Sequence, residues 1–374
     1  MDFSLQVEER TLLKRIDWNF VVCILGLNSI GLINLYSATH GPYSTGVGPL
    51  FINQILWLAV GWSAFFVTTL IDYRLVLRLA PLIFVINLCA VLYVTFYGRV
   101  ALGGQRWIDL GFFHYQPSET MKLALIAILA RVLSPKSVDG PGMGLRELLL
   151  PLLLMIVPFI FVVEQPDMGT ALLIALIGSS ILFFMKIRRW IIAAVVGFAV
   201  VAAPVIWTYG LRDYQKNRII NFLNPSNDPR GSGYNSIQSK IAVGSGKLFG
   251  KGFRKGTQSQ LEFLPERHTD FIFSVLSEEF GFFGSVLTLL VFAALFVIGV
   301  RIAATAKDKF GALLTLGVLC YLFWHMFINV GMVIGLLPIV GVPLPLLSYG
   351  GSSMLTTMMG LGLISSVAYR RYLF

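Results

Sequence analysis

The chain has 374 residues, of which 56% are hydrophobic and only 13% are charged, and its mean hydropathy is +0.77. This composition excludes a soluble globular domain and predicts an integral membrane protein. The formal net charge is +10 at pH 7. We expect no nucleic acid partner for this membrane protein.

Long apolar runs recur along the chain, each close to the roughly 20 residues that an α-helix needs to cross the hydrocarbon core of a bilayer. These runs are too long and too uniformly apolar for the strands of a barrel. We therefore expect an all-α polytopic membrane protein with about ten transmembrane helices. The predicted spans are residues 18–38, 52–71, 76–97, 117–134, 147–164, 168–186, 189–209, 270–303, 310–337 and 349–369.

The eighth predicted span, residues 270–303, is too long for one straight crossing of the membrane. Its sequence EEFGFFG contains Gly281 and Gly284, which predict a bend or a half-buried entry segment. The seventh and eighth spans are separated by one long basic segment, residues 210–268. This segment favours contact with anionic lipid or a phosphate-bearing substrate, although a solvated loop that is merely cationic fits the same composition.

Lys and Arg residues gather in the short loops on one side of the predicted bundle, which predicts that this side faces the cytoplasm. Both termini then lie in the cytoplasm, and residues 210–268 form a large extracytoplasmic loop, because long loops cross the membrane regardless of their charge. The residues behind this orientation are Arg10, Lys14, Arg15, Arg74, Arg78, Arg131, Lys136, Arg146, Lys186, Arg188, Arg189, Arg301, Lys307, Lys309, Arg370 and Arg371.

Five polar motifs fall on the opposite, external face under this orientation. Four of them begin helices, where unsatisfied N–H groups and the positive end of the helix dipole favour an anion such as a phosphate. Ordinary helix capping by Ser118, Asp167 and Thr269 explains any one of these motifs, but their convergence beside Arg106 favours a binding site. The five are GGQRWIDLG with Arg106, QPSETMK (116–122), EQPDMGT (164–170), ERHTDF (266–271) and LSYGGSS (347–353).

Lys122 lies within the apolar part of the fourth span, where an ionised side chain is costly and is usually paired or functional. Glu119 lies three residues earlier, so the two side chains can form an ion pair on one face of the helix. A purely structural ion pair is the alternative to a functional role. His325, in the ninth span, is interpreted as a hydrogen-bonded packing residue rather than a ligand.

Asp270 lies at the external end of the eighth span, where a carboxylate can act as a general base if a hydroxyl comes within hydrogen-bond distance. The alternative is that Asp270 only caps the helix. The helix N-terminus and Arg267 should lower the pKa of Asp270, whereas burial at the membrane boundary should raise it. No His, Glu or Cys spacing matches a metal site, although a divalent cation, Mg²⁺ or Mn²⁺, bridging acidic residues and a diphosphate is left open.

Several passages resemble, in order, the characteristic motifs of the SEDS family (shape, elongation, division, sporulation), polytopic bacterial peptidoglycan glycosyltransferases. The passages are QPSE, QPDMGT, GYNSIQSKIAVGSG, QLEFLPERHTDFIFSVLSEEFG and GVPLPLLSYGGSS. The likeness runs from the first span to the last, so we expect residues 1–374 to form a single SEDS membrane domain. The stretch TQSQLEFLPERHTDFIF is more similar to the rod-shape elongation members, of the RodA type, than to the division members, of the FtsW type.

The resemblance implies polymerisation of lipid II into glycan strands at the outer leaflet of the bacterial cytoplasmic membrane, during cell elongation and rod-shape maintenance. It implies Asp270 as the general base. It also implies partners: a class B penicillin-binding protein, that is, a transpeptidase of the PBP2 type, and other membrane proteins of the elongation machinery. A lipid II flippase and a non-catalytic scaffold for the penicillin-binding protein are the alternative functions. The expected substrate-binding residues are Arg106, Glu119, Lys122, Asp167, Arg267, His268, Ser348 and Ser352.

Overall fold

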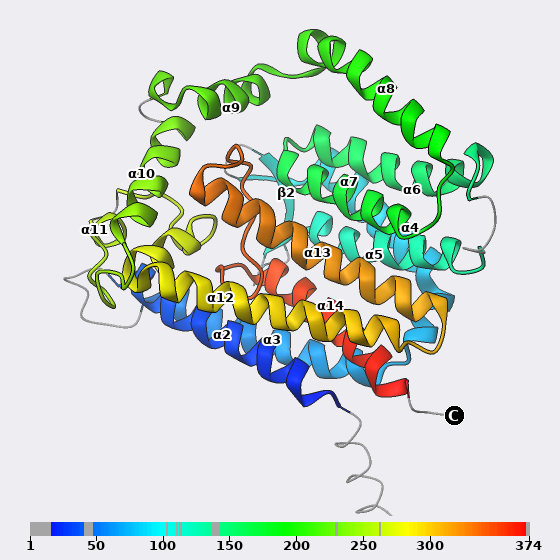
Figure 1. Ribbon diagram of the computed structural model, residues 1–374, viewed down its shortest axis with the longest axis horizontal. Coiled ribbons are helices and arrows are strands. Elements are labelled where there is room, and N and C mark those ends of the chain that lie inside the picture. The colour runs from blue at the N-terminus through cyan, green and yellow to red at the C-terminus, as the bar shows by residue number, and fades with distance from the viewer. Residues whose placement is uncertain are drawn as a thin grey trace, which may run out of the picture.

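The computed structural model is a bundle of helices with a helix at each of the ten predicted spans (Figure 1). It describes residues 16–40, 48–101, 104–109, 111, 114–136, 142–228, 231–261 and 263–371. The predicted cytoplasmic termini lie outside the described residues. The ten helices are α2 Trp18–Thr39, α3 Pro49–Leu70, α4 Tyr73–Tyr97, α5 Pro117–Leu133, α6 Leu145–Glu164, α7 Met168–Phe183, α8 Arg189–Val205, α12 Ile272–Ala304, α13 Lys309–Ile334 and α14 Gly351–Arg370.

Eight helices of the described chain are long and apolar enough to cross a membrane, whereas α5 and α7 have only 17 and 16 residues. A helix of this length rises only about 25 Å, somewhat less than the hydrocarbon core. Since α5 is buried along nearly its whole length, protein rather than lipid surrounds it. Helix α7 packs against α5, α6 and α13 and leaves one side, with Leu172 and Phe183, exposed. Two of the ten helices therefore depend on their neighbours within the bundle.

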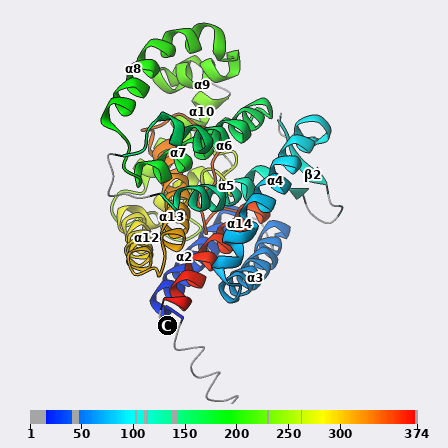
Figure 2. The ribbon, with the colours of Figure 1, turned by 90° about the vertical axis from the view of Figure 1, so that its right-hand side faces the viewer.

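Helix α8 stands apart from the other helices, as both views of the ribbon show (Figures 1 and 2). Ile191 is the only residue of α8 that is buried, although the helix is strongly apolar. Its side chains therefore face lipid on nearly all sides, as expected for a helix that is hydrophobic all round.

The segment between α8 and α12 is mostly helical, and a small antiparallel sheet of order β1-β2-β3 lies between α4 and α5. The sheet was not among the sequence predictions, which expected an all-α chain. Both features lie at the end of the bundle where α5, α7, α12 and α14 begin, which we call the site face. The elements are η1 Ile206–Gly210, α9 Asp213–Leu223, η2 Pro225–Asn227, α10 Ser232–Ser245, α11 Thr257–Gln260, β1 Arg99–Ala101, β2 Gly104–Asp109 and β3 His114–Tyr115.

Helix α12 is interrupted at Gly281, which has φ +65° and ψ −159°, so the predicted bend is confirmed. The interruption frees backbone groups on both sides, and lipid cannot bond to them. Residues 247–252, which we call the sealing segment, bond to them instead. A Cβ atom at Gly281 would lie 2.3 Å from the backbone nitrogen of Gly250, so the contact requires glycine. The bonds run from the N–H groups of Lys251 and Gly252 to the carbonyls of Glu278 and Glu279, and from those of Phe282 and Phe283 to the carbonyls of Lys247 and Leu248, over 2.9–3.1 Å.

Candidate active site

Asp270 lies on the site face, two residues before α12, and is partly buried. Its backbone carbonyl accepts a hydrogen bond of 2.8 Å from Asn329 Nδ2. Its carboxylate, in contrast, forms no hydrogen bond or ion pair with any other residue that the structure describes. Since Asp270 caps no helix with its side chain, the capping alternative fails and the carboxylate is free to act on a ligand.

Burial raises the pKa of Asp270 to about 6, and the Glu266 carboxylate acts in the same direction. The guanidinium groups of Arg218 and Arg106 oppose this rise, and the Asp167 carboxylate adds to it. Of the two opposing effects expected from the sequence, burial is therefore the stronger. A carboxylate with a pKa near the working pH is a better proton acceptor in catalysis than an ordinary surface aspartate.

The segment around Asp270 is held by backbone contacts to two other parts of the chain. Arg267 Nε donates to the Ala38 carbonyl at the end of α2, over 2.7 Å. Residues 340–349, which we call the strap, lie on the other side, where Ser348 Oγ donates to the Thr269 carbonyl at 2.7 Å. The Tyr349 N–H donates to the His268 carbonyl at 2.9 Å. The same elements therefore position three predicted site residues, Arg267, His268 and Ser348.

The side chains of Ser348 and His268 differ in whether their hydrogen-bonding groups remain available to a substrate. The hydroxyl of Ser348 also accepts from the Leu344 N–H at 2.8 Å, so both of its roles are used inside the protein. His268 packs its ring edge-on against Tyr349, and burial lowers the pKa of His268. Their predicted substrate contacts stay predictions.

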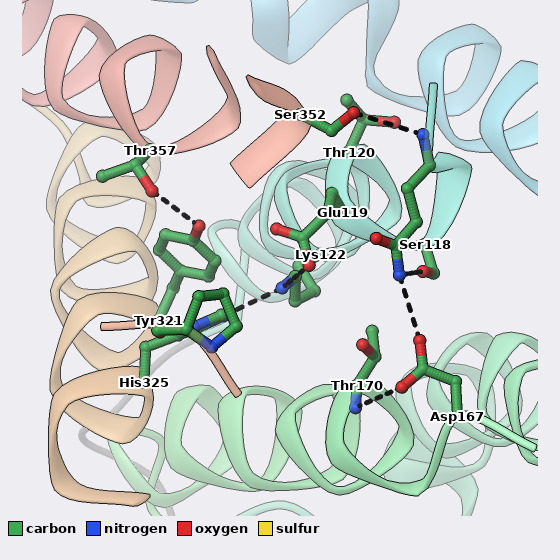
Figure 3. A network of polar contacts seen from close by, with 12 residues as sticks. Ser118, Glu119, Thr120, Lys122, Asp167, Thr170, Tyr321, His325, Ser352 and Thr357 are labelled. Atoms are coloured by element: carbon green, nitrogen blue, oxygen red, sulfur yellow. Dashed lines mark hydrogen bonds and ion pairs between the residues drawn. The ribbon is translucent and has the colours of Figure 1, made fainter. Parts of the chain in front are cut away.

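Arg106, on β2, and Asp167, at the start of α7, form the second part of the site. Arg106 Nη1 lies 3.7 Å from Asp167 Oδ1, and Arg106 also donates to the carbonyls of Gln165 and Pro166. Asp167 is the N-cap of α7 and accepts from the Thr170 N–H at 3.3 Å, so this predicted cap is confirmed (Figure 3).

The other two predicted caps are wrong, because the helices begin at different residues. Gln116 is the N-cap of α5 and Phe271 that of α12, and neither Ser118 nor Thr269 caps a helix with its side chain. Gln116 instead donates to both Ser118 Oγ and Asp167 Oδ2, at 3.1 Å each. These contacts join the beginnings of α5 and α7.

Ser352 ties the beginning of α14 to the same place. Its hydroxyl accepts from the Gln116 N–H at 3.3 Å (Figure 3). The same hydroxyl donates to the His114 carbonyl at 3.2 Å. Three helix N-termini, those of α5, α7 and α14, are therefore connected through Gln116. The motifs predicted that four helix N-termini converge, and these contacts join three of the four, without that of α12.

Lys122 is fully buried, and its ammonium nitrogen lies 2.7 Å from Glu119 Oε1, which confirms the predicted ion pair (Figure 3). The same nitrogen lies 2.8 Å from His325 Nε2 and 5.2 Å from the centre of the Tyr321 ring. His325 is therefore hydrogen-bonded and buried, as interpreted, but it belongs to the network of a predicted site residue. Glu119 Oε2 is buried and has no partner among the described residues.

Two residues next to Asp270 were absent from the sequence predictions. Arg218, on α9, lines a small pocket with Ile339 and makes no hydrogen bond or ion pair to a described residue. Helix α9 is placed at the start of α7 by a 2.9 Å contact from Gln215 Nε2 to Met168 Sδ. The spacing of Gln215 and Arg218, on one face of a helix, is the only sequence signal for this placement. Asn329 lies within the apolar run of α13, where an amide gives no signal of its partners.

The described residues contain no group of three or more His, Cys, Asp and Glu side chains that could hold a metal ion. The divalent cation left open by the sequence stays a prediction.

The fold and the site define a multi-pass membrane protein whose Asp270 carboxylate has no partner among the described residues and lies among helix N-termini and two guanidinium groups. A family model described as cell cycle protein, covering FtsW, RodA and SpoVE, matches residues 17–373. The chain belongs to this family. It is a multi-pass integral protein of the bacterial inner membrane, and the resemblance to the RodA type is confirmed.

Relatives and solved structures agree with this membership. The chain is 42% identical over 323 residues to the peptidoglycan glycosyltransferase MrdB of Escherichia coli K12, covering 85% of both chains. The crystal structure of the rod shape determining protein RodA of Thermus thermophilus matches with a TM-score of 0.70 at 27% identity, over 96% of this chain and 98% of that one. A further solved chain matches with a TM-score of 0.82 at 28% identity, over 96% and 99%. It is described with the words "Structural coordination of polymerization and crosslinking by a peptidoglycan synthase complex".

Proposed function

We propose that this chain, a peptidoglycan glycosyltransferase of the RodA type, polymerises lipid II during cell elongation with Asp270 as its general base. The observation that carries the role of Asp270 is its carboxylate, which is partly buried, has a pKa of about 6 and has no partner among the described residues. A buried carboxylate without a partner is costly to the fold, so its retention favours a chemical role.

The reaction joins two lipid-linked sugars. The Asp270 carboxylate takes the proton of the acceptor's 4-hydroxyl as the hydroxyl oxygen attacks the anomeric carbon of the donor. The bond between that carbon and the diphosphate oxygen breaks, and the electron pair leaves with the undecaprenyl diphosphate. The lipid diphosphate already activates the donor, so no nucleotide is needed.

The leaving diphosphate gains negative charge, and the site face offers groups that stabilise it. The N-termini of α5, α7 and α14 meet around Gln116, and Arg106 and Arg218 both act on Asp270 through their charge. Helix N-termini and guanidinium groups commonly bind anions by donating hydrogen bonds to them. We assign Arg106 and Arg218 to the diphosphate, and Asp167 to holding Arg106 in place.

The remaining site residues have supporting roles in this proposal. Glu119 and Lys122 form a buried ion pair within α5. Arg267, His268, Ser348 and Ser352 hold the segments that, in this proposal, face the substrate. The site face is extracytoplasmic, since lipid II is consumed at the outer leaflet. A class B penicillin-binding protein is the partner, which the solved complex for polymerization and crosslinking supports.

The test is polymerisation of labelled lipid II by the purified chain with its transpeptidase partner, whose own active site is blocked. We expect long glycan strands from wild type and none from Asp270→Asn, which is nearly isosteric. Asp109→Asn is the matched control, because Asp109 is an exposed aspartate of the same face that pairs with Arg99 at 2.6 Å.

Each outcome of this experiment decides between functions. Full activity of Asp270→Asn would remove the general base from the proposal. If wild type makes no strands while lipid II crosses reconstituted bilayers, the chain is a flippase. If neither activity appears but the partner still binds, the chain is a scaffold.

A further inference from the structure

Asn329 is fully buried in α13 and connects two segments that are far apart in the sequence. Its amide nitrogen donates to the carbonyl of Asp270 at 2.8 Å and to that of Val342, in the strap, at 2.7 Å. An amide nitrogen has two hydrogens, so both donors are used. Asn329 therefore fixes the distance between the backbone of Asp270 and the strap.

His325 lies one helical turn before Asn329 and contacts the next residue of the strap. Its Nδ1 lies 3.3 Å from the Pro343 carbonyl, and its Nε2 lies 2.8 Å from Lys122 Nζ. Because an ammonium group can only donate, Nε2 must accept, and the ring proton then sits on Nδ1 and points at the strap. The Lys122–Glu119 ion pair thereby sets the tautomer that lets His325 hold Pro343.

The strap in turn presses close to the reacting carboxylate. A Cβ atom at Gly341, which has φ +74°, would lie 3.3 Å from Oδ2 of Asp270. The hydroxyl of Ser348, further along the strap, holds the Thr269 carbonyl. The strap thus limits the position of the Asp270 carboxylate on one side. Helix α13 in turn holds the strap and the Asp270 backbone through Asn329.

We infer that Asn329 and His325 are positioning residues that hold the Asp270 carboxylate at its place in the site, an inference that rests on the proposed function. The acceptor of the Asn329 side chain, Oδ1, is buried and has no described partner. A leucine would avoid this unsatisfied atom within an apolar helix. The amide is therefore explained by its two donated bonds and not by packing.

The first test is Asn329→Leu in the lipid II polymerisation assay with the transpeptidase partner. We expect kcat to fall about 10- to 100-fold, because a small misplacement of a reacting group is enough for such a loss. KM for lipid II should stay close to wild type, since the groups assigned to the diphosphate are untouched.

The pH profile separates a positioning role from a merely structural one. If the carboxylate moves toward water, its pKa falls toward the ordinary value of 3.8, and the acidic limb of kcat moves to lower pH. The charged groups that face Asp270 are Glu266, Arg218, Arg106 and Asp167, and all stay in place. Partial unfolding would instead scale the whole profile down without moving its limb.

Asn28→Leu is the matched control, because Asn28 is a buried asparagine of α2 whose side-chain atoms have no described partner. It should keep the wild-type kcat and pH profile. Where both single variants fold, the double variant of Asn329→Leu and His325→Phe should lose less than the product of the two single losses. If Asn329→Leu does not fold, His325→Phe alone is tested with the same readouts.

A wild-type kcat and an unmoved limb in Asn329→Leu, or in His325→Phe where that variant replaces it, would overturn the inference while Asp270→Asn stays inactive. Full activity of Asp270→Asn would instead overturn the proposed function. The two failures are therefore distinguishable in one series of measurements.

Discussion

The Asp270 carboxylate lowers the stability of the folded protein at neutral pH. Its pKa is raised from 3.8 to about 6, so the folded state binds this proton more tightly than the unfolded state does. The stabilisation from the bound proton is complete below the unfolded pKa and is lost as the pH rises through the folded pKa.

We therefore expect Asp270→Asn to be inactive but more heat-stable than wild type at neutral pH, by on the order of 2–4 °C. The asparagine removes a buried charge without changing the shape of the side chain. The difference in Tm, followed by thiol-reactive dye unfolding in detergent, should shrink as the pH falls below 6. A less stable variant at neutral pH would show that the carboxylate has a structural partner.

Arg218 should set the pH dependence of the reaction. Its positive charge lowers the pKa of Asp270, so Arg218→Gln should raise that pKa and move the acidic limb of kcat/KM to higher pH. Arg212→Gln, at the N-cap of the same helix, is the control, because Arg212 is exposed and pairs with Glu164 at 2.8 Å. If the pH profiles of kcat/KM are the same for both variants, Arg218 does not act on Asp270.

The candidate site was predictable where a charge interrupts an apolar run, and unpredictable where contacts cross between distant segments. Asp270, Lys122 and Glu119 are costly in their surroundings, so the sequence marks them directly. Asn329 and Arg218 depend on which helices become neighbours. Hydropathy does not contain that information, and the spacing of Gln215 and Arg218 shows only that they share a helix face. The roles given to all these residues stay predictions until the variants are measured.

The interruption of α12 requires glycine at position 281, and this requirement can be tested by substitution. Gly281→Ala combines a positive φ with a Cβ atom 2.3 Å from the Gly250 nitrogen and 2.7 Å from the Leu248 carbonyl. We expect loss of the folded protein in fluorescence-detected size exclusion, because the backbone strain and the clash add to each other. Gly244→Ala is the control, since nothing lies within 4 Å of its added carbon.

The helices themselves were predictable because lipid leaves the backbone few alternatives. The bend at Gly281 followed from glycines in a span that was too long for one crossing. Three features did not follow: the small sheet, the helices within 210–268 and the separation of α8. Each depends on packing between segments, and hydropathy along one segment does not report which face meets protein and which meets lipid.

The orientation of the bundle can be measured with single cysteines. In a chain with Cys23, Cys89 and Cys320 replaced by alanine, Lys255→Cys tests the site face and Ala304→Cys the opposite end. Both positions are exposed. A membrane-impermeant maleimide added to intact spheroplasts should label Lys255→Cys and leave Ala304→Cys unlabelled until the membrane is opened. The reverse pattern would place the site in the cytoplasm and exclude the proposed function.

The sealing segment also bears on how the chain is made. Residues 247–252 leave the ribosome before Gly281 does, and in the proposed orientation they are already outside when α12 enters the bilayer. The interrupted helix can therefore form its hydrogen bonds with the sealing segment as it inserts. The backbone groups next to Gly281 then do not enter the lipid without partners. In this orientation, the loop that contains the sealing segment must be exported before α12 can complete its insertion. The order of these two steps follows from the order of the segments in the chain.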